Sequence, residues 1–451
     1  MIGIIGAGIS GLTLAYELQK EGEAYQLWEA TPQPGGYIRS VREGTYLREL
    51  GPNSLLGDDA LLAWLDELGL TPDLVFANAV SKARFIYRNG AYRELPGSPP
   101  ALLLGGFFSL KTKWAVLREL SNKTTSPPGE TLGQFFRRRF SSEIVDYALG
   151  PFVAGIYAGD PEQLLVSETF PLLLQYEHEY GSVLRGLIKN KNKTGRRQSF
   201  SFRDGMQMLP NALAAKLNQA HFSCPVQRIE RTPTGWTVHT PTGEYPVDRL
   251  VLAVGTDAAA RLLANHVPAF ANALRRIDYP PMMAVHTVYK RADVAHPLNG
   301  FGGLNPAVEG RFAAGHIWSS SIFPDRCPTD EVLFTTFVGG QQNAGNARLP
   351  EANIQARVHQ ELTESFGINA QKPVRQHLFP WPEAIPQYDH NLQAVKPLVV
   401  ALEADNLFIC ANWYGGVSLS ECITKAKALA GQLSSVSATG CKCCPTHWPP
   451  N

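Results

Sequence analysis

A glycine-rich turn near the N-terminus constrains the fold of this chain more than any other feature. Gly6, Gly8 and Gly11 follow an apolar run at residues 2–5, and apolar residues at helical spacing continue to Lys20. Gly6 permits a tight turn, Gly8 lets the backbone approach a pyrophosphate, and Gly11 lets a helix pack close to a sheet. The sequence therefore predicts a βαβ unit that binds a dinucleotide at a helix N-terminus, where free N–H groups favour phosphate.

An acidic residue at the end of the next strand supports this prediction. A second expected strand, at residues 25–28, ends at Glu29, 18 residues after Gly11. A carboxylate in this place can bind the ribose hydroxyls, and it repels a 2′-phosphate, which disfavours NADP. The alternative is a glycine-rich turn in another kind of α/β protein.

Later segments are expected to complete the same domain. Residues 34–40 contain a Gly-Gly pair, and residues 49–54 read Glu-Leu-Gly-Pro-Asn-Ser. Residues 249–255 and 406–411 are typical of buried strands, and the second is followed by a turn at 412–419 and a helical pattern. Together these elements resemble the FAD-containing amine oxidase superfamily. The resemblance implies non-covalent FAD and a discontinuous, Rossmann-like cofactor domain.

Four further segments narrow the resemblance to one family. They lie at residues 152–161, 202–210, 300–304 and 381–388. In this order they resemble the protoporphyrinogen oxidase family, over residues 1 to about 435. The resemblance implies an oxygen-dependent six-electron oxidation of protoporphyrinogen IX to protoporphyrin IX in haem synthesis, with hydrogen peroxide as the second product. Oxidation of coproporphyrinogen III to coproporphyrin III is the alternative, and more cations around the site would favour it.

The resemblance also assigns binding residues. The cofactor contacts fall on Gly6, Ala7, Gly8, Ile9, Ser10, Gly11, Glu29, Ala30, Gly35, Gly36, Gly51, Pro52, Asn53, Ser54, Val226, Trp381, Val417, Ser418 and Leu419. The substrate contacts fall on Arg84, Phe301, Gly302 and Leu304, which would form an apolar slot with a cation at its mouth. A guanidinium suits a propionate because it can bind a carboxylate through two parallel hydrogen bonds. Arg88 and Arg93 are nearby substitutes for Arg84, and Asn53 occupies a position that is often charged in the family.

No residue pattern predicts a catalytic acid, base or nucleophile, and none is assigned. Three histidines are interpreted as ordinary polar residues: His286, His316 and His390. Lys290 is interpreted as a surface lysine at a strand end. A cofactor that supplies the chemistry leaves the protein to orient the substrate.

The end of the sequence is rich in cysteine. Cys441, Cys443, Cys444 and His447 lack the paired spacing of a metal site. We therefore predict no metal and a disordered, reduced tail at 436–451.

We expect an α/β protein with a Rossmann-like FAD-binding domain, a mixed-sheet substrate domain and a helical membrane-associated region. Their expected ranges are, in that order, 1–80 with 197–272 and 395–435, then 273–394, then 86–196. Residues 82–200 hold 17 Lys and Arg against 10 Asp and Glu, a net charge of +7 in a chain of net charge +1. With its large apolar residues, this stretch fits a surface that rests on an anionic membrane, and a solvated basic face is the alternative.

Composition narrows the function classes. With 44% hydrophobic and 18% charged residues, the chain is not typical of disordered, coiled-coil or nucleic-acid-binding proteins. No apolar run reaches the roughly 18 residues that a spanning helix needs, and a strand pattern from Ile2 predicts no secretory signal. We expect a cytoplasmic protein, attached peripherally to the cytoplasmic membrane, whose partners are a porphyrinogen and molecular oxygen. Whether it forms a homodimer, or passes porphyrin to a ferrochelatase, stays open.

Two other classes of function stay open. An amine oxidase or a carotenoid desaturase would share the cofactor fold, with an aromatic cage or a longer apolar tunnel in place of the slot. A flavin-dependent mutase of sugar nucleotides, or a flavin-binding scaffold, would consume no oxygen. The mutase would also need a cluster of arginines for its nucleotide diphosphate.

Overall fold

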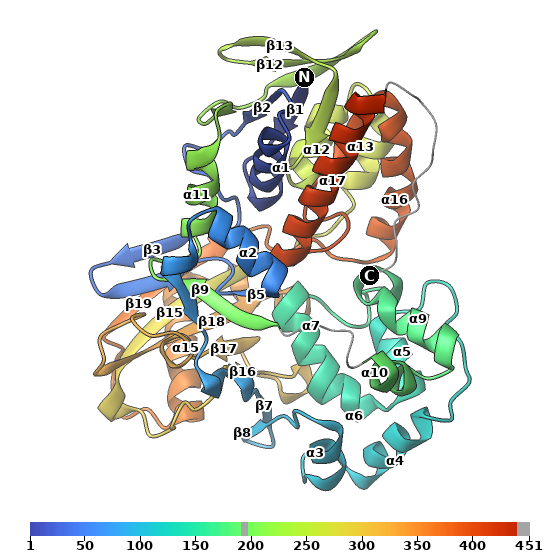
Figure 1. Ribbon diagram of the computed structural model, residues 1–451. Helices are drawn as coiled ribbons and strands as arrows, with labels where there is room; N and C mark the ends of the chain where they lie inside the picture. The colour runs from blue at the N-terminus through green and yellow to red at the C-terminus, as the bar shows by residue number, and fades with distance from the viewer. Residues whose placement is uncertain (191–196, 440–451) are drawn as a thin grey trace.

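A five-stranded parallel sheet forms the centre of the upper part of the molecule (Figure 1). The structure is a computed structural model that describes residues 1–190 and 197–439. The sheet has the strand order β10 (Ala220–His221), β2 (Tyr25–Trp28), β1 (Ile2–Ile5), β14 (Arg249–Leu252) and β20 (Leu407–Ile409). Its strands come from three distant parts of the chain, and the predicted strands at residues 2–5 and 25–28 are confirmed.

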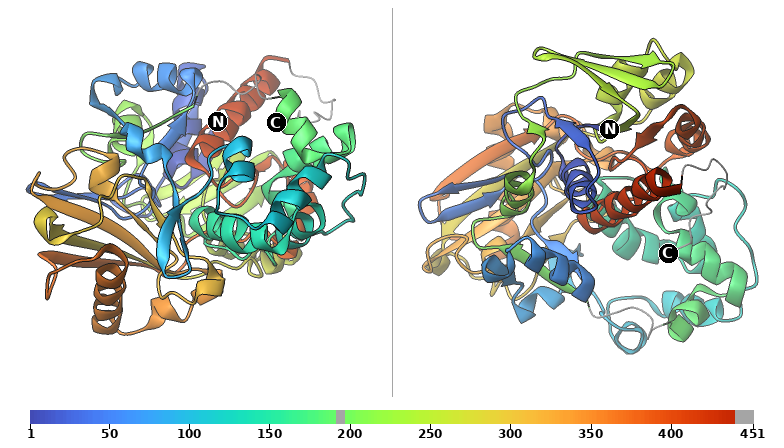
Figure 2. Two further views of the ribbon diagram at one scale, coloured as in Figure 1. Left: turned by 90° about the horizontal axis from the view of Figure 1, so that it is seen from below. Right: turned by 45° about the horizontal axis from the view of Figure 1, so that its top comes forward.

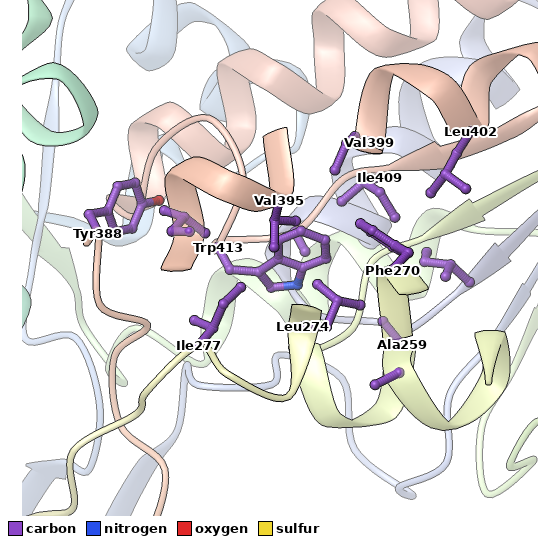
Figure 3. Packing of buried hydrophobic residues seen from close by; sticks show 14 of the residues in the cluster. Ala259, Phe270, Leu274, Ile277, Tyr388, Val395, Val399, Leu402, Ile409 and Trp413 are labelled. Atoms are coloured by element: carbon purple, nitrogen blue, oxygen red, sulfur yellow. The ribbon is translucent and has the colours of Figure 1, made fainter. Parts of the chain in front are cut away.

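Both faces of this sheet are buried. Leu250 and Leu252 point into one apolar core, and Val251 between them points into another. The first core is closed by α12 (Thr256–Leu263), α13 (Pro268–Leu274) and α16 (His390–Leu402), with Trp413 among their side chains (Figure 3). The second is closed by α1 (Ile9–Lys20) and α17 (Leu419–Thr439), which pack on each other. Cover on both sides explains why β1 and β20 are apolar throughout.

A second, seven-stranded mixed sheet lies below the first. Its strands run in the order β19 (Arg375–Trp381), β15 (Met282–Lys290), β18 (Glu331–Gly339), β17 (Gly315–Ile317), β16 (Gly302–Leu304), β7 (Phe85–Arg88) and β8 (Ala91–Glu94). Helix α15 (Glu351–Phe366) covers one face, where Ile354, Val358 and Leu362 pack against Val285 and Phe334. The opposite face is therefore the one that remains for a ligand.

The helical region lies beside this sheet, and Figures 1 and 2 show the two next to each other. It contains α3 (Pro99–Leu104), α4 (Leu110–Glu119), α5 (Leu132–Arg139), α6 (Ser142–Ile144), α7 (Gly150–Tyr157), α8 (Val166–Thr169), α9 (Pro171–Tyr180) and α10 (Val183–Asn190). Buried Arg139 joins its helices, because its guanidinium lies 2.8 Å from both Glu119 and Glu177. Within residues 1–190 and 197–439, none of the helices combines the length and the apolarity needed to span a bilayer.

Smaller elements connect these parts. They are α2 (Asp59–Glu67), α11 (Met208–Lys216) and α14 (Ser319–Ile322), the hairpin of β3 (Ser40–Glu43) and β4 (Tyr46–Glu49), the sheet of β5 (Leu55–Gly57), β9 (Gln198–Phe202) and β6 (Leu74–Phe76), and the sheet of β11 (Arg228–Thr232), β12 (Gly235–Thr240) and β13 (Gly243–Val247).

Three boundaries differ from those expected from the sequence. Strands β7 and β8 belong to the seven-stranded sheet, because β7 pairs with β16, so the helices begin only at α3 and not at residue 86. Helix α16 begins at His390 and packs on α13, ahead of the expected boundary at 395. Helix α17 continues to Thr439, so residues 436–439 are helical and not a disordered tail. The cysteines at 441, 443 and 444 lie outside the described residues.

Candidate active site

The glycine loops at residues 6–11 and 34–36 meet at the first turn of α1. Gly8 and Gly35 form a parallel bridge, and the Gly35 N–H donates to the Ala7 carbonyl at 2.8 Å. A Cβ on Gly11 would lie 2.0 Å from the Gly6 carbonyl oxygen, so this position requires glycine. The predicted contacts at Gly6–Gly11 and Gly35–Gly36 therefore lie together.

Space for an anionic ligand lies at the same place. A Cβ added to Gly8 would meet no atom within 4 Å, and one on Gly36 would meet only Gly8, at 3.4 Å. The N-terminal turn of α1 has no side-chain cap and no acidic residue. Its N–H groups and positive dipole end are therefore suited to the diphosphate of a dinucleotide.

Glu29 is fixed at the end of β2. Its Oε2 accepts a hydrogen bond from the Ala7 N–H at 2.7 Å, and its Oε1 accepts from the Thr31 N–H at 2.9 Å. The Cys224 N–H donates to the Glu29 carbonyl at 2.8 Å, which places half-buried Val226 near this end of the site. Ala30 is exposed in the turn that follows Glu29.

The last predicted cofactor segment, residues 417–419, lies close to the first, residues 6–11. Ser420, in the first turn of α17, donates through its hydroxyl to the Leu56 carbonyl at 2.6 Å. Burial raises the pKa of the Cys422 thiol, and a hydrogen bond with Ser10 of α1 lowers it in part. Residues 417–419 thus lie between the start of α1 and the segment that follows Ser54.

The loop at 51–54 is held by the seven-stranded sheet. Trp381 donates through Nε1 to the Leu50 carbonyl at 2.7 Å, and His286 lies with Nε2 2.9 Å from the Glu49 carbonyl oxygen. A Cβ on Gly51 would lie 1.9 Å from the Tyr37 carbonyl oxygen. The two predicted loops, at 34–36 and at 51–54, are therefore in close contact.

The predicted substrate residue Leu304 shares its sheet face with two residues that the sequence analysis missed. Leu304 pairs with Gly315, which pairs in turn with Phe337, and Ile317 pairs with Gly302 one step along. Paired residues point to the same face of a sheet. Leu304, Ile317 and Phe337 are all half-buried on the face away from α15. Only strand register could have identified the last two, because apolar residues fill both faces of β18.

Arg84 lies just before β7, at a position whose side chain is on the same face of the sheet as Leu304. Its guanidinium carbon lies 4.2 Å from the centre of the Phe301 ring, and no carboxylate in residues 1–190 or 197–439 pairs with it. The side chain is solvent-exposed, yet desolvation by the surrounding protein lowers its pKa. Both facts fit a cation in an open concavity. Arg88, by contrast, is bound to Glu143 at 2.6 Å and to the Phe107 carbonyl at 2.6 Å.

Two predicted cofactor residues and one predicted substrate residue line the same cavity. Asn53 and Ser54 line it from the cofactor loop, and Phe301 lines it from the seven-stranded sheet. Helix α7 contacts the same sheet at Leu304, whose side chain would lie 3.5 Å from a Cβ on Gly155. The cofactor loop and the seven-stranded sheet therefore line the cavity, and α7 packs on the sheet outside that lining.

A family model for flavin-containing amine oxidoreductases matches residues 9–433. The chain belongs to this family. The mitochondrial protoporphyrinogen oxidase of Nicotiana tabacum is 31% identical over 98% of this chain and 97% of its own. The human protoporphyrinogen oxidase is 28% identical over 97% of this chain and 98% of its own. The resemblance to the protoporphyrinogen oxidases is confirmed.

Solved structures of this oxidoreductase fold are close in shape. A protein from Exiguobacterium superposes with a TM-score of 0.79 at 21% identity, covering 96% of this chain and 98% of its own. A reduced UDP-galactopyranose mutase superposes with a TM-score of 0.73 at 15% identity, covering 96% of this chain and 95% of its own. The predicted α/β fold is confirmed, and because a mutase shares it, the fold alone does not choose the reaction.

Other groups in this flavin-dependent oxidoreductase have structural partners. His316 lies 2.9 Å from Thr336 and 3.2 Å from Glu361, which accounts for both ring nitrogens. Lys290 forms ion pairs with Asp330 and Glu331 at the surface. Among residues 1–190 and 197–439 no three His, Cys, Asp or Glu side chains are grouped as a metal site would require.

Proposed function

We propose that this protein oxidises protoporphyrinogen IX to protoporphyrin IX, with non-covalently bound FAD and with molecular oxygen as the final acceptor. Removal of six hydrogens in three cycles would yield three molecules of hydrogen peroxide. The proposal is supported by relatives of that name over nearly the whole chain. The glycine cradle and the fixed Glu29 carboxylate suit the two phosphates and the ribose of FAD.

One observation carries the choice of substrate: an arginine without an acidic partner at the edge of an apolar wall. Arg84 lies over Phe301, next to the cavity that the cofactor loop also lines. Leu304, Ile317 and Phe337 supply the wall. A tetrapyrrole with oily faces and carboxylate tails has the complementary chemistry.

The residues of the chain would bind and orient the substrate. FAD, when bound, accepts the hydride that leaves a carbon of the macrocycle. The apolar face would hold the ring flat and exclude water, and Arg84 would fix its rotation through a propionate. We assign no general base, so the nitrogen-bound proton would pass to solvent.

Protoporphyrinogen IX is preferred to coproporphyrinogen III because the relatives over nearly the whole chain are named for it. Arg88 is already neutralised by Glu143 and is not offered to a ligand. Arg39 and Arg93 are exposed, and the Arg39 guanidinium lies 5.6 Å from the Trp381 ring centre. Comparison of the two substrates in one assay therefore decides between two propionates and four.

A direct assay tests the proposal. The purified protein, loaded with FAD, receives each porphyrinogen without oxygen and then air. We expect bleaching of the flavin absorption, then porphyrin fluorescence and peroxide, faster with protoporphyrinogen IX. Flavin that stays oxidised in the presence of both substrates would reject a porphyrinogen oxidase. Faster reaction with coproporphyrinogen III would reverse the order of the two substrates.

We also propose that the protein is cytoplasmic and that its helical region rests on an anionic membrane surface. Three large apolar side chains on α3 and α4 project into solvent: Leu104, Leu110 and Trp114 are 87%, 78% and 68% exposed. Lys111 and Arg118 are exposed on α4 beside them. Apolar side chains among cations suit the boundary between acyl chains and anionic headgroups.

A further inference from the structure

A buried ion pair joins the cofactor loops to the substrate sheet. Glu49 is 4% exposed and Arg326 is 3% exposed, and Arg326 Nη1 donates to Glu49 Oε1 at 3.3 Å. Glu49 ends β4, and Arg326 lies between α14 and β18. Both side chains line the cavity that Asn53, Ser54 and Phe301 also line.

The pair is anchored from four sides. The Met206 N–H donates to Glu49 Oε1 at 3.0 Å, and the Ser40 hydroxyl donates to the other carboxylate oxygen. Arg326 Nη2 donates to the Ser201 hydroxyl at 2.7 Å, and its carbonyl accepts from the Leu47 N–H at 2.9 Å. Neither side chain can easily change its conformation, because these bonds satisfy most of the buried polar atoms of the pair.

The same contacts reach both proposed cofactor loops. Gln207, next to Met206, donates through Nε2 to the Pro34 carbonyl at 2.8 Å, just before Gly35. Glu49 itself is followed within two residues by Gly51, the start of the other loop. Its carbonyl and that of Leu50 are held by His286 and Trp381 of the seven-stranded sheet.

We propose that Arg326 is a positioning residue that, acting through Glu49, sets the distance between the cofactor loops and the substrate face of the seven-stranded sheet. The substrate part of this proposal rests on the proposed function, and the cofactor part does not. Without Arg326, a buried carboxylate would lose its counter-charge, and its pKa, which burial already raises, would rise further. The carboxyl would then be protonated and would accept more weakly from the Ser40 hydroxyl and the Met206 N–H, so the end of β4 at Glu49 would be less firmly held.

The test compares Arg326→Met with Arg139→Met. Arg139 is a matched control because its side chain is also fully buried between carboxylates, but within the helical region. The readouts are Tm, the Kd for FAD of the apoprotein, and the absorption and circular dichroism of the bound flavin. None of them needs a porphyrinogen, so a failed oxidase assay leaves this test intact.

We expect both variants to lower Tm, and only Arg326→Met to weaken FAD binding, by at least tenfold, and to shift the flavin spectra. The double variant Glu49→Gln with Arg326→Met removes both charges. It should therefore reverse most of the decrease in Tm that Arg326→Met causes, while FAD binding stays weak. Wild-type FAD affinity and spectra in the double variant would overturn the proposal. So would equal flavin changes in Arg139→Met, or a wild-type chain that binds no FAD.

Discussion

The guanidinium carbon of Arg84 lies 4.2 Å from the centre of the Phe301 ring. This stacking holds the long side chain in one orientation while its N–H groups stay free for an anion. A cation held in this way, at the rim of an apolar wall, loses little conformational freedom when it binds a carboxylate.

Replacement of Arg84 by Gln should therefore weaken substrate binding more than it slows turnover. A charged hydrogen bond contributes about 1.5–3 kcal/mol, so we expect KM to rise roughly 10- to 100-fold while kcat changes less. Steady-state kinetics with protoporphyrinogen IX measures both. Arg261→Gln is the control, because Arg261 pairs with Asp257 on the exposed side of α12. An unchanged KM in Arg84→Gln would remove this residue from the site.

Two alanine substitutions in one loop should separate cofactor binding from folding. The Cβ of Gly8→Ala would enter open space at ordinary backbone angles, whereas that of Gly11→Ala would lie 2.0 Å from the Gly6 carbonyl oxygen. We expect Gly8→Ala to keep the Tm of the apoprotein and to weaken FAD by at least about tenfold, or about 1.4 kcal/mol. Gly11→Ala should lower stability by about 1–3 kcal/mol through overpacking. Tight FAD binding by Gly8→Ala would show that the diphosphate lies elsewhere.

Acid should loosen the contact between β15 and the cofactor loop. Desolvation lowers the pKa of buried His286 to about 4, below its usual 6.5. Between pH 6.5 and 4 the unfolded chain binds the extra proton and the folded one does not, so stability falls as the pH falls. The full effect is at most about 3 kcal/mol. Thermal unfolding across this range should show a shallower pH dependence in His286→Gln than in the wild type. Equal slopes would mean that His286 is already protonated, or not buried, in the folded protein.

Attachment to lipid should depend on α4. Transfer of a large apolar side chain out of water contributes about 1.5–3 kcal/mol. Trp114→Glu combined with Leu110→Glu should therefore abolish sedimentation with vesicles that contain anionic lipid. Val400→Glu is the control, since Val400 is also exposed, at 60%, but lies on α16. Equal binding of the wild type to neutral and anionic vesicles would contradict the role of the basic residues.

The sequence was most informative where function depends on consecutive residues. Gly6, Gly8 and Gly11 share one turn, so their spacing alone indicated the cradle, and Glu29 followed from the length of one βαβ unit. Ile317 and Phe337 were missed because strand register, which no local pattern specifies, decides which face of a sheet a residue occupies. Strands β7 and β8 were misassigned for a related reason, since their partner β16 lies more than 200 residues away. No sequence pattern around Arg326 indicates its proposed role, because that role depends entirely on its contact with Glu49.

The position of β20 in the parallel sheet has a consequence for the order of assembly. Strand β1 is made first, its neighbour β14 follows almost 250 residues later, and β20 closes the edge at residues 407–409. During translation, the apolar side chains of the first strands stay incompletely covered until the ribosome has synthesised β14 and β20. The nascent chain would therefore be vulnerable to aggregation for most of its synthesis, and chaperones that shield unpaired strands should determine how much active protein a cell obtains.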